Sequence, residues 1–343
     1  RVPDHAAVAA TVDATRALKK HWAKGMTNAV LRRYLREREQ LTQALDEAAA
    51  ASHPAWLFQK ILAQWPAAAA AIIDANNQQP PMTLRVNRGQ ASRDDYIGSL
   101  KGHGIAAEAG CLSKHAIQLA VPIDVWDLPE FSAGRVSVQD EAAQMAALLL
   151  QAGAGERVLD ACAAPGGKTC HILELQPELA ELVAMDIDEL RLQKVSENLQ
   201  RLNLKATLIT GDAASPPAAL EPASFDRILV DAPCSASGVI RRHPDVKLLR
   251  RESDIAPLAD QQLCILRGLW PLLKTGGTLL YATCSILDEE NSQVIQRFLT
   301  EEADAALSDT EMAGSESVTS GRQLLPSSGG TDGLFYATLK KVG

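Results

Sequence analysis

Residues 157–169 read RVLDACAAPGGKT, a short apolar run that passes through two adjacent glycines into a helical stretch. A strand that turns into a helix at glycine leaves the backbone open to close approach by a ligand, because no Cβ stands in the way. A similar alternation of apolar runs and helical stretches continues through the second half of the chain. The stretch therefore predicts the first strand and helix of an α/β domain, with a ligand site at the turn.

The second half of the chain carries apolar runs of strand length with helical stretches between or after them. This pattern predicts a parallel sheet covered on both faces, in a Rossmann-like, doubly wound domain whose ligands bind at the carboxyl ends of the strands. Residues 303–332 predict a loop, and 333–341 predict a last strand. The other predicted strands are 157–161, 182–187, 207–210, 227–231 and 278–283, and the predicted helices are 168–176, 188–202, 256–273 and 288–300.

The first part of the chain shows helical periodicity followed by short strand-like runs. Residues 5–48 predict two or three helices with a break at Gly25, and residues 54–75 predict further helix with Pro54 in its first turn. A small α+β unit should follow. Its strand-like runs are 82–86, 117–119 and 136–138, and its helical stretch is 92–101.

We therefore expect three parts. A helical segment at 1–50 precedes a helical linker with the α+β unit at 51–137, and the doubly wound domain occupies 138–343. Because the sequence opens at Arg1 within helical periodicity, we expect it to be part of a longer protein.

The composition, with 46% apolar and 22% charged residues, is that of an ordinary globular protein. No apolar run approaches the ~18–20 residues that span a bilayer, and no basic-then-apolar leader opens the sequence. The six cysteines include no C-x-x-C pair and no histidines at zinc spacing, so neither a disulfide framework nor a metal site is expected. We expect a cytoplasmic protein with no membrane partner.

A net charge of −8 argues against a protein that coats nucleic acid without selectivity, yet basic residues cluster in two stretches. The cluster at 16–38 is equally compatible with nucleic-acid contact and with solvated helix faces. The cluster at 241–251 follows the Pro-Cys-Ser stretch at 233–235, and here we predict contacts to phosphates. The residues expected to make them are Arg241, Arg242 and His243.

The Gly-Gly turn fits neither of two common nucleotide motifs, because a P-loop needs glycine where this chain has Cys162 and the G-x-G-x-x-G fingerprint is absent. Acidic residues follow the next two strands. Asp186 comes 20 residues after Gly166, the offset at which a carboxylate meets a ribose, and Asp212 could reach an adenine amino group. These features indicate an adenosyl cofactor without a pyrophosphate, of which S-adenosylmethionine is the commonest. The alternative is that Asp186 is only a helix cap.

Two further predicted strands each end near a cysteine that is followed by serine, in the stretches 231–235 and 283–285. These strands are neighbours in a doubly wound sheet, so Cys234 and Cys284 would reach the rim that holds the cofactor. One such cysteine would be interpreted as a buried core residue. Two at strand ends are harder to explain in that way, and they indicate chemistry.

A thiol pair beside a methyl donor suits methylation of cytosine at carbon 5. A thiolate that adds to carbon 6 turns the ring into an enamine, so that carbon 5 can attack the methyl group. Asp231 is placed to stabilise the charge that develops at N3, and a second acid/base group would help to remove the carbon-5 proton. Lys168 could orient the base or its acidic partner. This chemistry leaves open which thiol attacks.

The motifs at 160–169, 231–235 and 283–285 resemble those of the RNA cytosine-C5 methyltransferases, the Nol1/Nop2/Sun family, and above all those of its bacterial members that act on 16S ribosomal RNA. Residues 1–48 resemble the tail of the NusB-like RNA-binding domain of those proteins. The stretches that extend the resemblance over most of residues 50–300 are 52–57, 76–87, 138–140 and 238–245.

The resemblance implies a role for each site residue. In the RNA family the Thr-Cys-Ser cysteine attacks, which makes Cys284 the nucleophile, and the Pro-Cys thiol, here Cys234, assists product release. In the DNA enzymes the Pro-Cys thiol attacks instead. Asp231 and Lys168 complete the catalytic set. The residues implied to bind the cofactor or lie beside it are Cys162, Ala163, Ala164, Pro165, Gly166, Gly167, Lys168, Asp186, Asp212 and Asp231.

The resemblance also implies S-adenosylmethionine as cofactor and 16S ribosomal RNA, short of the fully assembled subunit, as substrate; we expect a monomer. Two alternatives remain. A ring-amine methyltransferase would carry an Asp/Asn-Pro-Pro-aromatic motif where this chain reads Asp231-Ala232-Pro233-Cys234. An RNA-binding ribosome assembly factor with an inactive methyltransferase domain would bind RNA without transferring a methyl group.

Overall fold

The computed structural model describes residues 2–308 and 311–343, and the chain divides into two compact units, Arg1–Gln59 and Lys60–Gly343. The first unit is helical, as predicted for residues 5–48. Its helices are α1 Asp4–Ala17, α2 Ala23–Gln43, α3 Glu47–Ala50 and the first residues of α4 Ala55–Gln64.

The predicted break at Gly25 is wrong, because Gly25 lies inside α2. The chain turns earlier, at Lys19, which has a φ of +57°. There the Lys20 N–H donates to the carbonyl of Thr15 at 2.8 Å and closes the end of α1. Glycine near the start of an exposed helix costs only about 1 kcal/mol, so the α2 pattern tolerates it.

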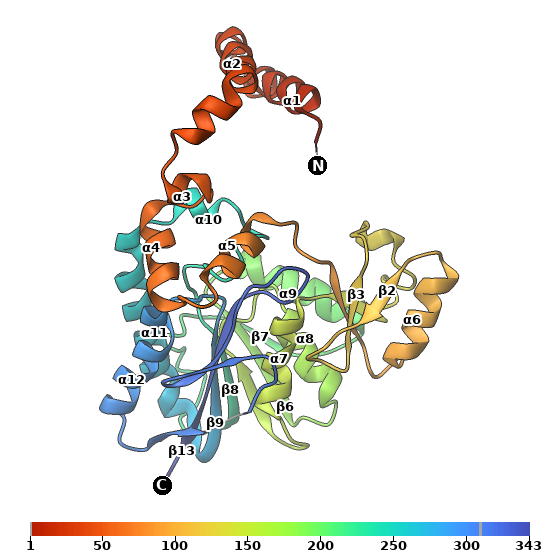
Figure 1. The fold of residues 1–343 in the computed structure, drawn as a ribbon. Helices are drawn as coiled ribbons and strands as arrows, with labels where there is room; N and C mark the ends of the chain where they lie inside the picture. The colour runs from red at the N-terminus through yellow and green to blue at the C-terminus, as the bar shows by residue number, and fades with distance from the viewer. Residues whose placement is uncertain (1, 309–310) are drawn as a thin grey trace. The chain divides into compact units, whose positions relative to one another are not determined.

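A four-stranded antiparallel sheet with one helix forms the predicted small α+β unit (Figure 1). The strands run in the order β2-β3-β1-β4, and α6 buries Tyr96 and Leu100 against them. Strand β2 was not predicted, since its three residues, Ala-Glu-Ala, are few and include no β-branched or aromatic side chain. The bounds are β1 Thr83–Val86, α6 Arg93–Gly102, β2 Ala107–Ala109, β3 Ala116–Leu119 and β4 Val136–Val138.

The predicted doubly wound sheet is confirmed. Five parallel strands run in the order β7-β6-β5-β8-β9, and β13 pairs with β9 in the antiparallel direction. The strand order reverses between β5 and β8, and a crevice at the carboxyl ends is expected at such a point. The bounds are β5 Arg157–Asp160, β6 Glu181–Asp186, β7 Thr207–Thr210, β8 Phe225–Asp231, β9 Leu273–Thr283 and β13 Leu334–Lys341.

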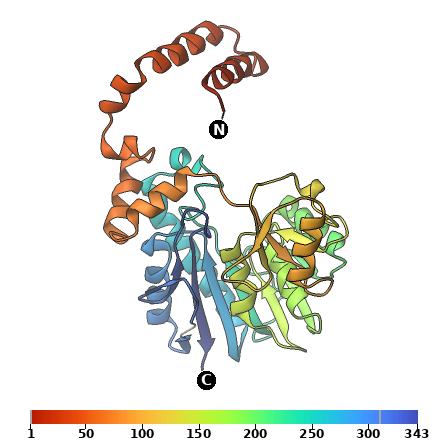
Figure 2. The ribbon, with the colours of Figure 1, turned by 45° about the vertical axis from the view of Figure 1, so that its right-hand side comes forward.

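Helices cover both faces of this sheet (Figures 1 and 2). Successive side chains of a strand point to opposite faces. Val158 and Leu229 belong to the core on the side of α7, α8 and α9, whereas Leu159 and Val230 belong to the core on the side of α11 and α12. The helices are α7 Glu141–Leu150, α8 Gly167–Leu175, α9 Glu189–Leu202, α11 Ile255–Leu269 and α12 Ser292–Glu301.

Two predicted segments are more divided than expected. Residues 54–75 form α4 and α5 Ala69–Asn77, separated around Pro66, which has no N–H to donate. Residues 303–332, predicted as a loop, contain three short strands that pair along the outer edge of β13 or extend from it. These strands carry little apolar alternation. They are β10 Ala305–Ser308, β11 Glu316–Val318 and β12 Gly321–Leu324.

Arg85 joins the small sheet to α8 of the large domain. Its Nε and Nη2 donate to the two carboxylate oxygens of Glu174 on α8 at 2.9 and 2.7 Å. Its Nη1 donates to the Gly167 carbonyl at 2.8 Å, at the start of that helix. Both charged side chains are almost wholly buried. If one is removed, the other is left buried without compensation.

We predict that Glu174→Ala lowers the free energy of unfolding of the Lys60–Gly343 unit by about 3–5 kcal/mol. Urea unfolding followed by circular dichroism measures this change. The control is Glu130→Ala, which removes the exposed ion pair with Arg135 and should cost at most about 1 kcal/mol. Equal, small losses in both variants would contradict the buried-pair interpretation.

Candidate active site

A cavity lies at the carboxyl ends of β5, β6, β8 and β9, where the strand order reverses. Its wall includes two acidic residues at strand ends, Asp186 and Asp231, and both cysteines of the predicted pair, Cys234 and Cys284. The structure thus brings these four side chains to one rim. The other lining residues are Ala161, Cys162, Ala164, Ile187, Arg191, Gly211, Asp212, Ala213, Ala232, Pro233, Gln261 and Ile265.

Backbone geometry shapes the turn from 162 to 168. The Ala164 N–H donates to Asp186 Oδ2 at 3.1 Å, which fixes the turn to the end of the next strand. Gly166 caps α8 with a φ of +98°, and a Cβ there would lie 3.1 Å from the Val195 Cα. Glycine is therefore required at this position. Cys162 and Ala164 line the cavity, whereas Ala163, Pro165, Gly166 and Gly167 form the rest of the turn.

Asp186 is buried at the end of β6. Its Oδ1 accepts the Asp188 N–H at 3.2 Å and lies 3.3 Å from the Arg191 guanidinium. The residue that caps α9 is Asp188, whose side chain accepts the N–H groups of Leu190 and Arg191. The alternative that Asp186 is only a helix cap is therefore wrong, and its carboxylate is held in one orientation at the cavity wall.

The wall between Asp186 and Asp212 fits an adenosyl group. Ile187 is 65% exposed although its side chain is large and apolar, and it lines the cavity with Pro233 and Ile265. Asp212 is exposed, and its Oδ1 accepts the N–H of Ala214 at 2.9 Å. Apolar surface with a few placed carboxylates suits a flat ring joined to a hydroxylated sugar.

Cys234 Sγ and Cys284 Sγ lie 3.4 Å apart on the cavity wall. They meet because β8 and β9 are parallel neighbours, with Asp231 opposite Ala282 in the register. Cys234 is buried and Cys284 is partly exposed. The hydrogen bond to Cys284, together with burial and nearby negative charge, raises the pKa of Cys234 well above its ordinary value. The two thiols are adjacent but not equivalent.

Lys168 and Asp231 form an ion pair at the same rim, with Nζ 2.6 Å from Oδ2. Burial lowers the pKa of Lys168, but the charge of Asp231 and its hydrogen bond outweigh burial, so the pKa is raised and Lys168 remains an ammonium. Asp231 lines the cavity and Lys168 does not, so the ion pair joins the start of α8 to the carboxylate at the end of β8. Such a pair can orient a polar ring edge.

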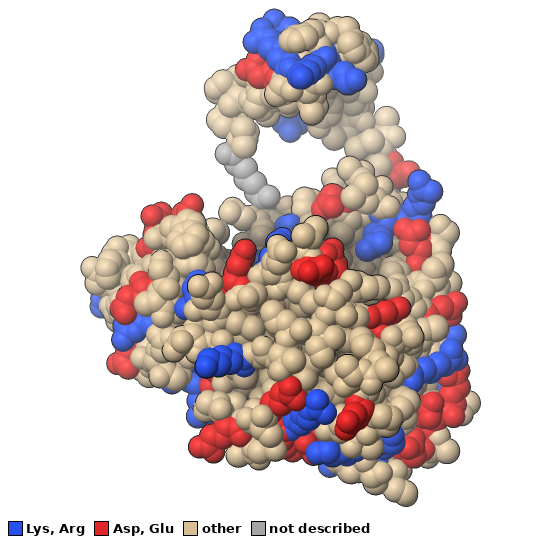
Figure 3. Space-filling view, turned by 180° about the vertical axis from the view of Figure 1, so that it is seen from behind, with Lys and Arg blue, Asp and Glu red and all other residues tan. Residues whose placement is uncertain are grey.

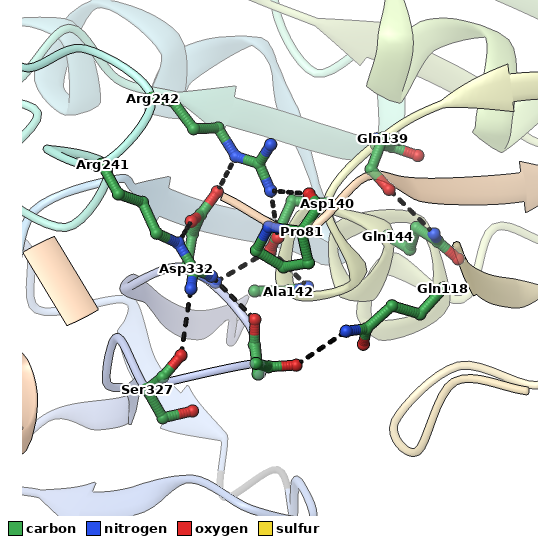
Figure 4. Close-up of polar contacts among 12 residues, drawn as sticks. Pro81, Gln118, Gln139, Asp140, Ala142, Gln144, Arg241, Arg242, Ser327 and Asp332 are labelled. Carbon is green, nitrogen blue, oxygen red and sulfur yellow. Dashed lines mark hydrogen bonds and ion pairs between the residues drawn. The ribbon is translucent and has the colours of Figure 1, made fainter. Parts of the chain in front are cut away.

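The structure contradicts the prediction that Arg241 contacts an RNA phosphate (Figure 4). Its side chain is almost wholly buried. Nε donates to Asp332 Oδ1 at 2.7 Å, and Nη1 and Nη2 donate to the carbonyls of Ser327 and Gly330 at 3.0 and 2.7 Å. Arg241 holds the segment before β13 in place, and its charge is paired inside the protein.

The same correction applies to Arg242, which donates to Asp332 and, at 2.8 Å, to Asp140 Oδ2 (Figure 4). Burial and the charge of Asp332 raise the pKa of Asp140 to about 6, against the opposing effect of Arg242. The predictions for Arg241 and Arg242 were wrong because their shared partner Asp332 lies about 90 residues away in the sequence, where no local pattern shows it. Of the three predicted RNA contacts, only His243 is exposed.

Sequence reasoning missed three residues of this region. Ile187 could have been found, since it is an apolar residue directly after the predicted ribose aspartate. Asp160 was noted only as part of the glycine motif; it is fully buried, accepts from the Thr169 hydroxyl at 2.6 Å, and has a pKa raised to about 7, mainly by burial. Glu290 lies behind the thiols, and no local pattern marks it.

Two other kinds of site are absent from the described residues. Across 2–308 and 311–343, no three His, Cys, Asp or Glu side chains come together as a metal site. Over the same ranges, no helix combines the length and apolarity that a membrane span requires.

Two family models match the chain. The model of the 16S rRNA methyltransferase RsmB/F matches residues 147–340, and that of an RsmF/B-like ferredoxin-like domain matches residues 53–126. Among curated proteins, the ribosomal RNA small subunit methyltransferase B of Pseudomonas syringae pv. tomato is 50% identical, over 100% of this chain and 78% of the relative. The protein of the same name from Serratia proteamaculans is also 50% identical, over 100% and 79%.

Solved structures share the fold. The crystal structure of PH0851 superposes with a TM-score of 0.87 at 26% identity, covering 96% of this chain and 75% of that one. A methyltransferase homologue from Pyrococcus horikoshii gives 0.76 at 29% identity, covering 87% and 98%. NSun6 from Pyrococcus horikoshii, with the S-adenosylmethionine analogue SFG, gives 0.74 at 21% identity, covering 84% and 98%.

We predict that Asp186→Ala weakens the binding of S-adenosylmethionine by about 1.5–3 kcal/mol for each charge-assisted hydrogen bond to the ribose that it removes. Isothermal calorimetry measures the dissociation constant. Asp188→Asn is the matched control, because it removes a neighbouring charge but keeps a helix cap, and its affinity should be that of the unmodified protein. Unchanged affinity in Asp186→Ala would rule out the ribose assignment.

Proposed function

Because the chain belongs to the RsmB/F family of 16S ribosomal RNA methyltransferases, we propose that it methylates a cytosine of that RNA at carbon 5, through a covalent bond from Cys284 to carbon 6. The coarser activity follows from the family: the chain is an S-adenosylmethionine-dependent ribosomal RNA methyltransferase. The target atom and the covalent step are the proposal. The observation that carries it is the 3.4 Å separation of the Cys234 and Cys284 sulfurs at the cofactor cavity.

The cavity residues divide between the cofactor and the base. When bound, S-adenosylmethionine supplies the methyl group. We assign Asp186 to the ribose hydroxyls, Ile187 and Asp212 to the adenine, and the 162–168 turn to close backbone contact. This assignment leaves Asp231, Lys168 and the two thiols for the cytosine.

Cys284 suits the attack because it is the more exposed of the two thiols and lines the cavity, within the electrostatic reach of the Lys168 ammonium. The sulfur bond to carbon 6 makes carbon 5 nucleophilic, and Asp231 with Lys168 can stabilise the charge at the N3 edge. Cys234 is buried, and its pKa is raised, first by the hydrogen bond to Cys284. We assign it the exchange of a proton and not the attack.

Turnover then requires two further bond changes at the base. The electron pair of the carbon 5–hydrogen bond re-forms the double bond to carbon 6, and the bond between carbon 6 and the Cys284 sulfur breaks with its electrons returning to that sulfur. Cys234 can give its proton to the departing Cys284 sulfur and take the carbon-5 proton in its place. Cys234 Sγ lies 3.4 Å from that sulfur, which places it to serve the release step. We therefore assign product release to Cys234.

For RNA binding we propose the exposed cations outside the active site. In the helical segment the eight Lys and Arg residues between 16 and 38 are all exposed, and several gather on the face shown in Figure 3. Near the thiols, Arg251 is exposed, and Arg250 donates to the carbonyls of Cys234 and Ser235. We propose that 1–50 and the 51–137 region contribute RNA contacts and that 138–343 carries the catalysis.

Different observations argue against the two alternatives, a ring-amine methyltransferase and an inactive assembly factor. Nothing resembling the motif of ring-amine enzymes follows β8, where the chain reads Asp231-Ala232-Pro233-Cys234. An inactive assembly factor has no need of two thiols in contact at a cofactor cavity, and the relatives are named as methyltransferases.

We predict that Cys284→Ala abolishes both methylation and the covalent protein–RNA adduct, because the attacking sulfur is gone. Cys234→Ala should instead accumulate an adduct that survives denaturing electrophoresis, since release is blocked. The assay uses labelled S-adenosylmethionine and protein-free 16S ribosomal RNA, and bisulfite sequencing locates the methyl group. Cys111→Ala, at an exposed thiol of the small α+β unit that does not line the cavity, is the control and should match the unmodified enzyme.

A reversed pattern, with the adduct accumulating in Cys284→Ala, would exchange the two roles. Full activity in both variants would exclude covalent catalysis altogether. Methylation at a position other than carbon 5 would overturn the proposed target atom.

We predict that Arg251→Ala flattens the salt dependence of RNA binding, since removing one phosphate interaction reduces the slope of log K against log salt by roughly 0.7–0.9. Filter binding between low and moderate salt measures the slope, and cofactor affinity should not change. Arg267→Ala, which removes an exposed cation paired with Glu301, is the control. An unchanged slope in Arg251→Ala would show that this residue is solvated and does not contact an RNA phosphate.

A further inference from the structure

Glu290 lies directly behind the two thiols, at the end of the short 3₁₀ helix Asp288–Glu290, and has no exposed surface. Its Oε1 accepts the backbone N–H of Ser235 at 2.7 Å, and its Oε2 accepts the hydroxyl of Ser285 at 2.6 Å. Ser235 follows Cys234, and Ser285 follows Cys284. One carboxylate therefore binds the residue after each thiol.

The other contacts of this carboxylate reinforce the same link. Gln262 Nε2 donates to Glu290 Oε1 at 3.2 Å and to the Pro233 carbonyl at 2.9 Å. The Ser235 and Ser285 hydroxyls lie 3.3 Å apart. A buried carboxylate held by neutral donors is costly in stability, so it is not explained as a stabilising ion pair.

We propose that Glu290 is a positioning residue that holds the Cys234 and Cys284 loops in one register and reserves the attack on the base for Cys284. The inference rests on the covalent mechanism proposed above. Glu290 does not line the cavity, so it acts through the two loops and not on the substrate.

Charge placement gives the physical reason for the asymmetry. Glu290 contributes to the raised pKa of Cys234, after the hydrogen bond to Cys284, burial and the charge of Cys284, because a nearby negative charge disfavours a thiolate. Burial raises the pKa of Glu290 itself, and the hydrogen bonds from Ser235 and Ser285 oppose that shift. The Lys168 ammonium interacts with Cys284. Cys234 thus has a buried acidic group beside it, whereas Cys284 interacts with a fixed cation. The titratable and charged groups around Cys234 are Cys284, Glu290, Tyr281 and Arg250.

The test compares Glu290→Gln with Glu289→Gln in the full chain. Glu289 is the adjacent carboxylate but pairs with Lys60 and Gln64, away from the thiol loops. With protein-free 16S ribosomal RNA, Glu290→Gln should lower kcat on the order of 10- to 100-fold through misplaced thiols, and KM for S-adenosylmethionine should not change. Glu289→Gln should leave both values unchanged.

A second measurement reads the thiol directly and does not depend on catalysis. In a Cys284→Ala background, the rate at which iodoacetamide alkylates Cys234 is followed against pH by mass spectrometry. Adding Glu290→Gln should lower the pH midpoint, because a like charge has been removed. Adding Glu289→Gln should not move the midpoint.

The proposal is overturned if Glu290→Gln matches Glu289→Gln in both kcat and the Cys234 midpoint. If Glu290→Gln fails to fold, Ser285→Ala tests the register, since it removes one bond to Glu290 and no charge. It should lower kcat about tenfold or more, and an unchanged kcat would count against the proposal. Activity retained by Cys284→Ala would refute the covalent mechanism itself. The alkylation midpoint of Cys234 does not depend on catalysis, so it tests the Glu290 inference separately.

Discussion

The parallel pairing of β8 with β9 is the constraint on which the rest of the site depends. Both strands end at the same edge of the sheet, and Asp231 is paired with Ala282 in the register. The loops that follow are then tied together: the Gly238 N–H donates to the Cys284 carbonyl at 2.9 Å. A Cβ at Gly238 would lie 2.1 Å from the carbonyl oxygen of Gly333, so glycine is also required here for the segment before β13 to pack against this loop. The contact between the two sulfurs therefore depends on strand pairing and on the hydrogen bond that joins the two loops.

Buried charge is the second theme of the structure, and its cost explains where it occurs. The protein buries Arg85 with Glu174 at the junction of its two sheets and Arg241 with Asp332 beside the loop that follows Cys234. Each pair needs full hydrogen bonding to offset desolvation, and each joins segments that are distant in sequence. Arg85 contacts the glycine turn through the Gly167 carbonyl, and Arg241 lies in the loop that follows Cys234. The fold therefore uses ion pairs mainly to fix geometry around the site.

What could be predicted from the sequence is what depends on neighbours in the chain. The glycine turn at 162–168, the strand-end acids and the two Cys-Ser motifs were found because strand, turn and helix patterns are local. Arg241 and Arg242 were misassigned because their partner Asp332 is distant in sequence, and a basic run looks the same whether its charges face solvent or an internal carboxylate. Glu290 was missed for the same reason: its role arises only when two loops meet. The short strands after residue 303 form because β13 offers an edge, which no local pattern reveals.

Arg241 and Arg242 are paired with carboxylates inside the protein, so they are not counted among the cations that contact RNA. A protein of net charge −8 then needs other cations to bind a polyanion. The stretch 241–251 keeps few free cations, since Arg250 also holds the carbonyls of Cys234 and Ser235. Under the proposed mechanism, its main contribution near the thiols is therefore shape: internal arginines fix the loop beside which the base would enter. Long-range attraction has to come from cations that remain exposed, and the helical segment holds eight of them between 16 and 38. Attraction and base placement are thus assigned to different parts of the chain, so a change to one should leave the other largely intact.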